Sequence, residues 1–167
     1  MMLSSVECDS SLYSNYMNSI SDEVISFLHS HVLATLGTFP VGGSSSGSGP
    51  HLTSVFYFFE NEKLHFASRR KSQKIENLIA NPSVSFLITD QEKLLTLQIE
   101  GTAQVDEKQD PSLINKLIDL ANQQSKDSFP PFMKAGQSQF ITVTIDIRYF
   151  KLSQYPDSPA SYTEGSP

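Results

Sequence analysis

Residues 64–82 have the sequence LHFASRRKSQKIENLIANP, which is the most informative stretch of the chain. A short apolar strand is followed by a basic turn with two serines, and the turn opens a helix that ends at Asn81-Pro82. Five of the twelve Lys and Arg residues lie between Lys63 and Lys74, although the net charge of the chain is -6. Because a helix N-terminus offers free backbone N–H groups and a positive dipole end, this concentration of positive charge indicates an anion site.

The side chains that could surround a phosphate in this turn are Ser68, Ser72, Gln73 and Lys74. They would add hydrogen-bond donors and a positive charge to the N–H groups of the helix. A solvated basic loop with an ordinary capping serine accounts for the same residues equally well. The phosphate motifs GxxxxGK(S/T) and GxGxxG are absent, so a phosphate bound here would be held by a different architecture.

Length and composition indicate one globular domain over residues 19–154, with flexible tails over 1–18 and 155–167. No apolar run is long enough to span a membrane, and the N-terminus does not resemble a signal peptide. We therefore expect a cytoplasmic protein without a membrane partner. The net charge of -6 argues against a nucleic-acid partner, and the single Cys8 excludes an intrachain disulfide.

Alternating apolar and polar residues predict a mainly β chain. We expect strands at residues 31–39, 51–59, 63–67, 83–89, 94–105 and 139–147, with 148–152 continuing the last strand or forming a further one. Most connections between these strands are short. An antiparallel barrel, closed or partly closed, fits this pattern best because closure removes exposed strand edges.

Three helices are expected at the connections. The first follows a capping Ser21, and the third follows Asp110-Pro111, an N-cap and a first-turn proline. The second covers residues 73–80 and is expected to bury Ile75, Leu78 and Ile79.

Two details concern the strands themselves. The three residues 60–62 join the second and third strands in a hairpin, and Gly101 is expected at a bulge.

Two strand segments have polar residues that could face a ligand. Thr53 and Ser54 begin an otherwise apolar and aromatic strand along which a flat ring could lie, although a buried hairpin strand with surface hydroxyls explains them more simply. Thr96 and Gln98 share one face of a later strand, which fits a ligand contact or a half-exposed strand equally well.

Motifs for metal binding and nucleophilic catalysis are missing. The sequence contains no HExxH, CxxC or GxSxG and no acidic cluster at metal-ligand spacing, so we expect no dedicated metal site. A protein with a phosphate site and no evident acid, base or nucleophile needs a cofactor for demanding chemistry. The catalytic residues therefore stay unassigned.

In order and spacing, these segments resemble the pyridoxamine 5'-phosphate oxidase-like proteins, the FMN-binding split barrels. The resembling pieces are residues 34–38 (ATLGT), 50–58 (PHLTSVFYF), 64–85 and 97–103 (LQIEGTA). The resemblance implies a six-stranded antiparallel split barrel with Greek-key order and two to three peripheral helices. It also implies FMN as cofactor and a homodimer with the flavin bound at the subunit interface.

The resemblance also implies which residues bind the flavin. The phosphate would be held by Ser68, Ser72, Gln73 and Lys74, with Ala67 beside them. The isoalloxazine ring would lie along the backbone of Thr53, Ser54 and Val55, and Thr96 or Gln98 would touch the flavin from the strand before the Gly101 bulge.

The function implied by the resemblance is flavin-dependent oxidoreduction of a small-molecule substrate. A flavin- or haem-binding module without turnover and a deazaflavin F420-dependent reductase are the alternatives in the same fold. True pyridoxamine-phosphate oxidases have an Arg early in the second strand, where this chain has His51 or Leu52, and a C-terminal Trp, whereas this chain has no Trp. These departures argue against pyridoxal phosphate synthesis.

Overall fold

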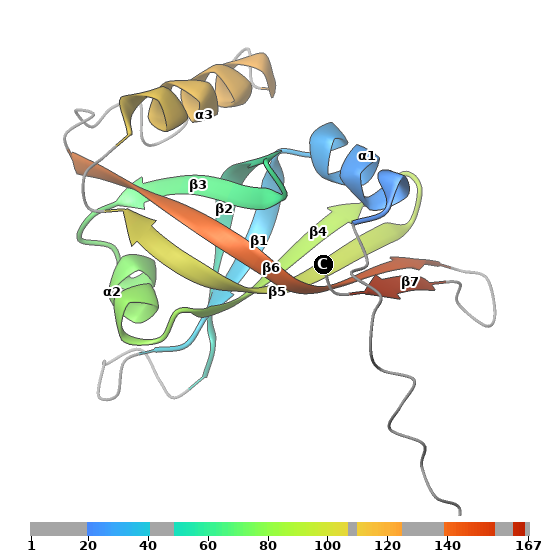
Figure 1. The fold of residues 1–167 in the computed structure, drawn as a ribbon, viewed down its shortest axis with the longest axis horizontal. Coiled ribbons are helices and arrows are strands. Elements are labelled where there is room, and N and C mark those ends of the chain that lie inside the picture. Colours follow the sequence, from blue (N-terminus) through green and yellow to red (C-terminus); the bar gives the residue numbers. More distant parts are fainter. Residues whose placement is uncertain (1–19, 41–48, 107–109, 125–138, 156–161, 166–167) are drawn as a thin grey trace, which may run out of the picture.

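The computed structural model describes residues 20–40, 49–106, 110–124, 139–155 and 162–165 (Figure 1). Within these ranges the helices are α1 (Asp22–Ser30), α2 (Gln73–Ala80) and α3 (Pro111–Gln124). The strands are β1 (Leu33–Thr38), β2 (His51–Glu60), β3 (Lys63–Arg69), β4 (Ser83–Asp90), β5 (Leu95–Asp106), β6 (Phe140–Gln154) and β7 (Tyr162–Gly165). The N-terminal tail expected over residues 1–18 lies outside the described residues.

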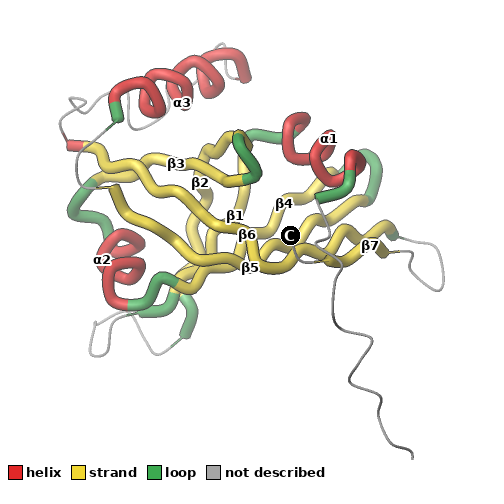
Figure 2. The backbone as a smooth tube through the Cα atoms, viewed as in Figure 1, coloured by secondary structure: helices red, strands yellow, loops and turns green. Residues whose placement is uncertain are grey.

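The first six strands form a closed antiparallel barrel. The sheet order is β3-β2-β1-β4-β5-β6-β7, and an additional pairing of β3 with β6 closes the barrel (Figure 2). The first three strands follow one another in a meander, and β4 returns to the far side of β1. This is Greek-key order, with α2 inside the long connection. The predicted six-stranded barrel is therefore confirmed.

The barrel interior is filled by one face of each strand. In β4, for example, Val84, Phe86 and Ile88 are buried, while the residues between them face outward. The largest side chains with almost no exposure are Tyr57, Phe66 and Phe86, and the rings of Phe66 and Tyr57 both pack edge-on against Phe86. Since full burial of a large apolar side chain contributes about 1.5–3 kcal/mol, this alternation specifies which strand face points inward.

The predicted bulge is present at Gly101. The pairing of β5 with β6 shifts between Glu100 and Gly101, so that Arg148 is the extra residue on β6. A Cβ atom on Gly101 would lie 2.6 Å from the backbone oxygen of Asp146 and 2.7 Å from a methyl carbon of Ile145. Only glycine therefore allows the two strands to approach so closely here.

Several element boundaries differ from the prediction. The first strand begins at Leu33 rather than at residue 31. Of the two alternatives for residues 148–152, the structure shows continuation of the preceding strand, since residues 140–154 form one strand. The β2–β3 hairpin turn has only two residues, Asn61 and Glu62, both with positive φ of 52° and 60°. A flexible tail was expected over residues 155–167, whereas Tyr162–Gly165 pairs with the end of β6 as β7.

The helices cover different parts of the barrel (Figures 1 and 2). α3 packs against β2, β3 and β6, α1 lies against β2, and α2 lies by β1 and β5 at one end of the barrel. The prediction for the buried face of α2 was wrong in one respect: Ile79 is 67% exposed, and Asn77 is completely buried instead. No helix in the described part of the chain has the length and apolar character that crossing a bilayer requires.

Candidate cofactor site

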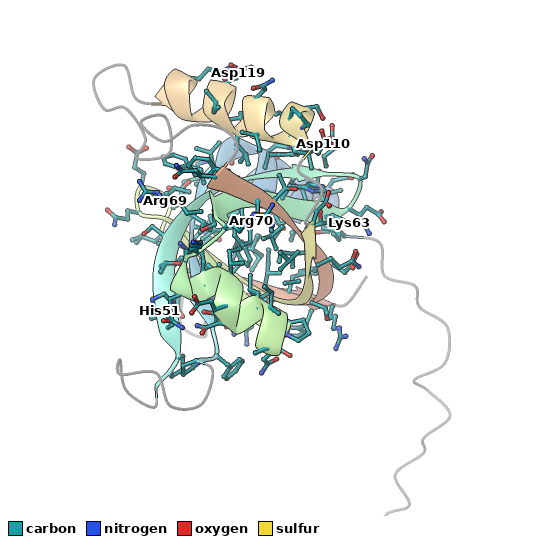
Figure 3. The ribbon with its side chains drawn as sticks, turned by 90° about the vertical axis from the view of Figure 1, so that its left-hand side faces the viewer. His51, Lys63, Arg69, Arg70, Asp110 and Asp119 are labelled. Carbon is teal, nitrogen blue, oxygen red and sulfur yellow. The ribbon has the colours of Figure 1, made fainter. Side chains whose placement is uncertain are left out.

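A pocket of about 350 Å³ lies where β2 and β3 meet the first turn of α2. Its polar lining comes from Ser54, Ser68, Arg69, Ser72 and Lys74. Its apolar lining comes from Leu33, Val55, Phe56, Ala67 and Phe140. The pocket therefore combines apolar side chains from the strands with polar and cationic ones, among which Ser72 and Lys74 come from the start of α2. Figure 3 views this side of the barrel, with Arg69 and Arg70 above α2.

Two serine hydroxyls meet at the helix end of the pocket. The Oγ atoms of Ser68 and Ser72 are 3.0 Å apart, and Ser68 is buried. Ser72 is the N-cap residue of α2, yet its side chain makes no capping hydrogen bond to the helix. The first backbone N–H groups of a helix have no intrahelical acceptor. The hydroxyl pair and these N–H groups together make a set of donors suited to an anion.

Lys74 lines the same pocket as these two serines. Burial lowers the pKa of Lys74, because removing water disfavours the charged form. Every ion pair found among the described residues involves other side chains, so none of their carboxylates neutralises Lys74. A half-buried ammonium without a counter-ion is stabilised by binding an anion.

A second hollow, of about 380 Å³, is lined by α1, the end of β2 and α3. There the amine of Lys116 is 2.6 Å from a carboxylate oxygen of Glu60 and 4.9 Å from the centre of the Phe58 ring. This pairing also lowers the pKa of Glu60. Because its cation is already neutralised, this larger hollow is the poorer anion site of the two.

The predicted site residues are only partly brought together in one chain. Six of the ten line the pocket, namely Ser54, Val55, Ala67, Ser68, Ser72 and Lys74. Of the other four, Thr53 directs its hydroxyl into the barrel, where it is buried without a partner among the described residues. The Gln73 amide turns away from the pocket and donates a hydrogen bond to Asn77.

Thr96 and Gln98 lie on β5, which is next to β6, the strand that carries the pocket residue Phe140. They pair with Ser153 and Lys151 near the last residue of β6, whereas Phe140 is the first residue of that strand. Thr96 pairs with Thr89 and Ser153, and Gln98 is exposed. A single chain therefore does not place either side chain in the pocket.

The sequence did not single out four residues that line the pocket: Leu33, Phe56, Arg69 and Phe140. Arg69 belongs to the basic turn. Phe140 lies beside Arg69 only because β6 pairs with β3, the pairing that closes the barrel. The strand alternation indicated which face Phe140 occupies and could not indicate its partner strand. No group of three His, Cys, Asp or Glu side chains suited to a metal ion occurs in the described ranges.

Comparison with known proteins gives a family match. The profile of the pyridoxamine 5'-phosphate oxidase family matches residues 20–151. No match was found among curated proteins.

Several solved structures have a similar fold. An F420 reductase is 20% identical, with a TM-score of 0.58 over 75% of this chain and 93% of that protein. General stress protein 26 from Bacillus anthracis is 19% identical, with a TM-score of 0.59 over 86% and 97% of the two chains. A pyridoxamine 5'-phosphate oxidase-related, FMN-binding protein from Nostoc punctiforme is 12% identical, with a TM-score of 0.55 over 81% and 86%. At these identities the likeness shows the shared fold.

Proposed function

Because the chain belongs to the pyridoxamine 5'-phosphate oxidase family, we propose that it binds FMN and acts as a flavin-dependent oxidoreductase on a small molecule. The observation behind this proposal is the half-buried amine of Lys74, which has no carboxylate partner among the described residues and lies beside the Ser68–Ser72 hydroxyl pair. An FMN-binding protein is among the solved structures with this fold.

The phosphate of FMN fits the helix end of the pocket. The Lys74 ammonium would supply the counter-charge, and the hydroxyls of Ser68 and Ser72 would donate hydrogen bonds to phosphate oxygens. The free N–H groups at the start of α2 would add further donors. The Ser72 hydroxyl is available because it does not cap its own helix.

The flavin ring fits the strand end of the pocket. Phe56 and Ala67 present apolar surface there, with Leu33 paired to Phe56, while Phe140 lies opposite Arg69, nearer the start of α2. Bound FMN supplies hydride or electron transfer. The chain's own part is to anchor the phosphate, to orient the ring along β2 and to exclude water with the apolar wall.

We also propose that a second copy of the chain covers this site. Three leucines on the outer face of neighbouring strands are solvent-exposed in one chain: Leu33 on β1, Leu52 on β2 and Leu87 on β4 (52%, 66% and 44%). Leu33 also lines the pocket, so a partner packed on these leucines would close the pocket from outside. In such a dimer, Thr96 and Gln98 would have to reach the flavin from the other subunit.

The cofactor is tested by the visible absorption spectrum of the purified protein, before and after addition of FMN, with mass spectrometry of any released ligand. We expect a flavin band, the mass of FMN, and a dimer in sedimentation analysis. A colourless protein that does not bind added FMN would refute the proposal. Turnover assays with NAD(P)H, aerobic and anaerobic, distinguish an oxidoreductase from a flavin-storing module, and a Soret band would indicate haem instead.

Deazaflavin F420 is the second candidate. Arg70 and Lys71 are exposed next to the pocket residue Arg69, and three neighbouring cations could contact the acidic tail that F420 has and FMN lacks. The net charge of -6 opposes a long acidic ligand, so FMN remains the first choice. Titration of the same protein with F420 and FMN decides between them by affinity.

A further inference from the structure

Asn77 is a polar residue at a core position of α2. Its neighbours on the buried face of this helix are Ile75 and Leu78, and Asn77 is completely buried. Burying a side-chain amide is unfavourable unless its hydrogen bonds are made. The apolar pattern alone would bury Ile79 in this helix, yet Ile79 is 67% exposed. The helix is thus rotated so that an amide, rather than an isoleucine, faces the barrel.

The Asn77 amide connects two parts of the fold. Its Nδ2 donates to Oγ1 of Thr38 at the end of β1, over 3.0 Å. Its Oδ1 accepts a hydrogen bond from Nε2 of Gln73 in the first turn of α2, also over 3.0 Å. Thr38 is itself buried, and its hydroxyl donates to the backbone oxygen of His51 at the start of β2. The series Gln73–Asn77–Thr38 therefore links the first turn of α2 to the barrel wall.

This link acts on the part of α2 that borders the pocket. An isolated helix of eight residues is not stable in water, so α2 depends on its packing for a fixed position. Apolar contacts are not directional, whereas buried hydrogen bonds specify rotation and register. Gln73 lies between Ser72 and Lys74, both of which line the pocket. Holding Gln73 therefore holds the backbone that presents the anion donors.

We infer that Asn77 is a positioning residue, which fixes the first turn of α2 on the barrel through Gln73 and Thr38. Gln73 then acts as part of this brace and not as a direct ligand. The inference rests on the proposed function, because the bound phosphate is taken to be that of FMN. FMN and riboflavin differ only in the phosphate, so a residue that positions the phosphate end affects one ligand and spares the other.

The test compares the affinities of FMN and riboflavin, measured by quenching of flavin fluorescence, in the full-length protein and two variants. Asn77→Ala removes the amide, and Thr38→Val replaces its hydroxyl acceptor by a methyl group with little change of shape. We expect each variant to bind FMN about tenfold more weakly, the loss typical of one hydrogen bond to a charged group, with riboflavin affinity within about twofold of wild type. Thr38→Val suffices on its own if Asn77→Ala does not fold.

Leu78→Ala is the matched control. Leu78 is buried on the same helix next to Asn77 but makes no side-chain hydrogen bond. Its truncation should lower the melting temperature and leave the ratio of the two affinities unchanged. Equal losses of FMN and riboflavin affinity in Thr38→Val, or the same change of ratio in Leu78→Ala, would reduce Asn77 to a structural role and overturn the inference. If wild type binds both flavins equally, the proposed phosphate site is wrong and the inference about Asn77 fails with it. If wild type prefers FMN, the phosphate site stands, and the variants alone decide whether Asn77 positions it.

Discussion

Replacement of Lys74 by Ala is the most direct test of the anion site. Lys74 is half-buried beside Ser68 and Ser72, and its charge has no counter-ion among the described residues. At an effective dielectric constant of about 20, two unit charges 4 Å apart attract each other by about 4 kcal/mol, and part of this is lost in removing water from both groups. The net contribution of a charge-assisted hydrogen bond is about 1.5–3 kcal/mol.

We therefore expect Lys74→Ala to weaken FMN binding by about 10- to 150-fold, and riboflavin binding to stay near the wild-type value. Isothermal titration calorimetry with both flavins measures the two affinities at neutral pH. Lys71→Ala is the matched control, because it removes the same charge from an exposed position of the same turn that does not line the pocket. A solvent-exposed charge contributes about 1 kcal/mol or less.

Unchanged FMN affinity in Lys74→Ala would show that the Lys74 ammonium does not hold the phosphate. An equal loss in Lys71→Ala would be just as damaging, because it would mean that the general positive charge of the turn, and not the geometry around Lys74, attracts the ligand. Loss of riboflavin and FMN affinity together would indicate that the substitution disturbs the pocket as a whole.

Three further predictions concern pH and backbone conformation. Burial lowers the pKa of Lys74 in the folded protein, so at pH values between its folded and unfolded pKa the unfolded state binds more protons, and the stability of the unliganded protein rises with pH. FMN affinity should fall over the same pH interval, because the amine loses its charge. Lys74→Arg keeps its charge and should remove this fall in titrations at increasing pH. Glu62→Gly should stabilise the protein by about 0.5–1 kcal/mol in urea unfolding, because Glu62 has a φ of 60° that glycine adopts without strain, whereas Glu62→Ala should give no such gain. Gly101→Ala should destabilise the protein by about 1–3 kcal/mol, because the added Cβ would lie 2.6 Å from the backbone oxygen of Asp146. The melting temperature should fall by about 2–4 °C per kcal/mol. An unchanged melting temperature would mean that β5 and β6 move apart at the bulge without cost.

Local sequence was sufficient for most strands and for the basic turn that opens α2. Alternation in β4 and β5 specified which residues point inward, and Gly101 marked the bulge because only glycine fits so close an approach. The basic turn was evident because charge and hydroxyl residues gather at a helix start. These features depend on neighbours in the sequence, so the sequence alone could predict them.

Features that depend on pairing between distant segments could not be predicted in this way. Phe140 reaches the pocket only because β6 pairs with β3, more than seventy residues earlier in the chain. The rotation of α2 about its axis is a second such feature. The apolar pattern favours burial of Ile79, whereas in the structure Asn77 faces the barrel and hydrogen-bonds to Thr38, 39 positions earlier in the chain. Thr96 and Gln98 were grouped with the pocket by resemblance, and one chain separates them from it.

The topology itself explains why the proposed anion site lies at this turn. Because β4 pairs with β1 and not with β3, the chain must cross one end of the barrel after β3, and α2 is the segment that crosses. The helix begins at Gln73, a short turn after β3 ends at Arg69, so its free N–H groups lie close to the end of that strand. A helix there needs a fixed rotation before its N-terminus can form a site, and the buried amide of Asn77 supplies a directional contact that the apolar residues of α2 cannot. The residues proposed to hold the phosphate are thus positioned within one chain, whereas the exposed Leu33 at the same pocket is where the proposed second copy would pack.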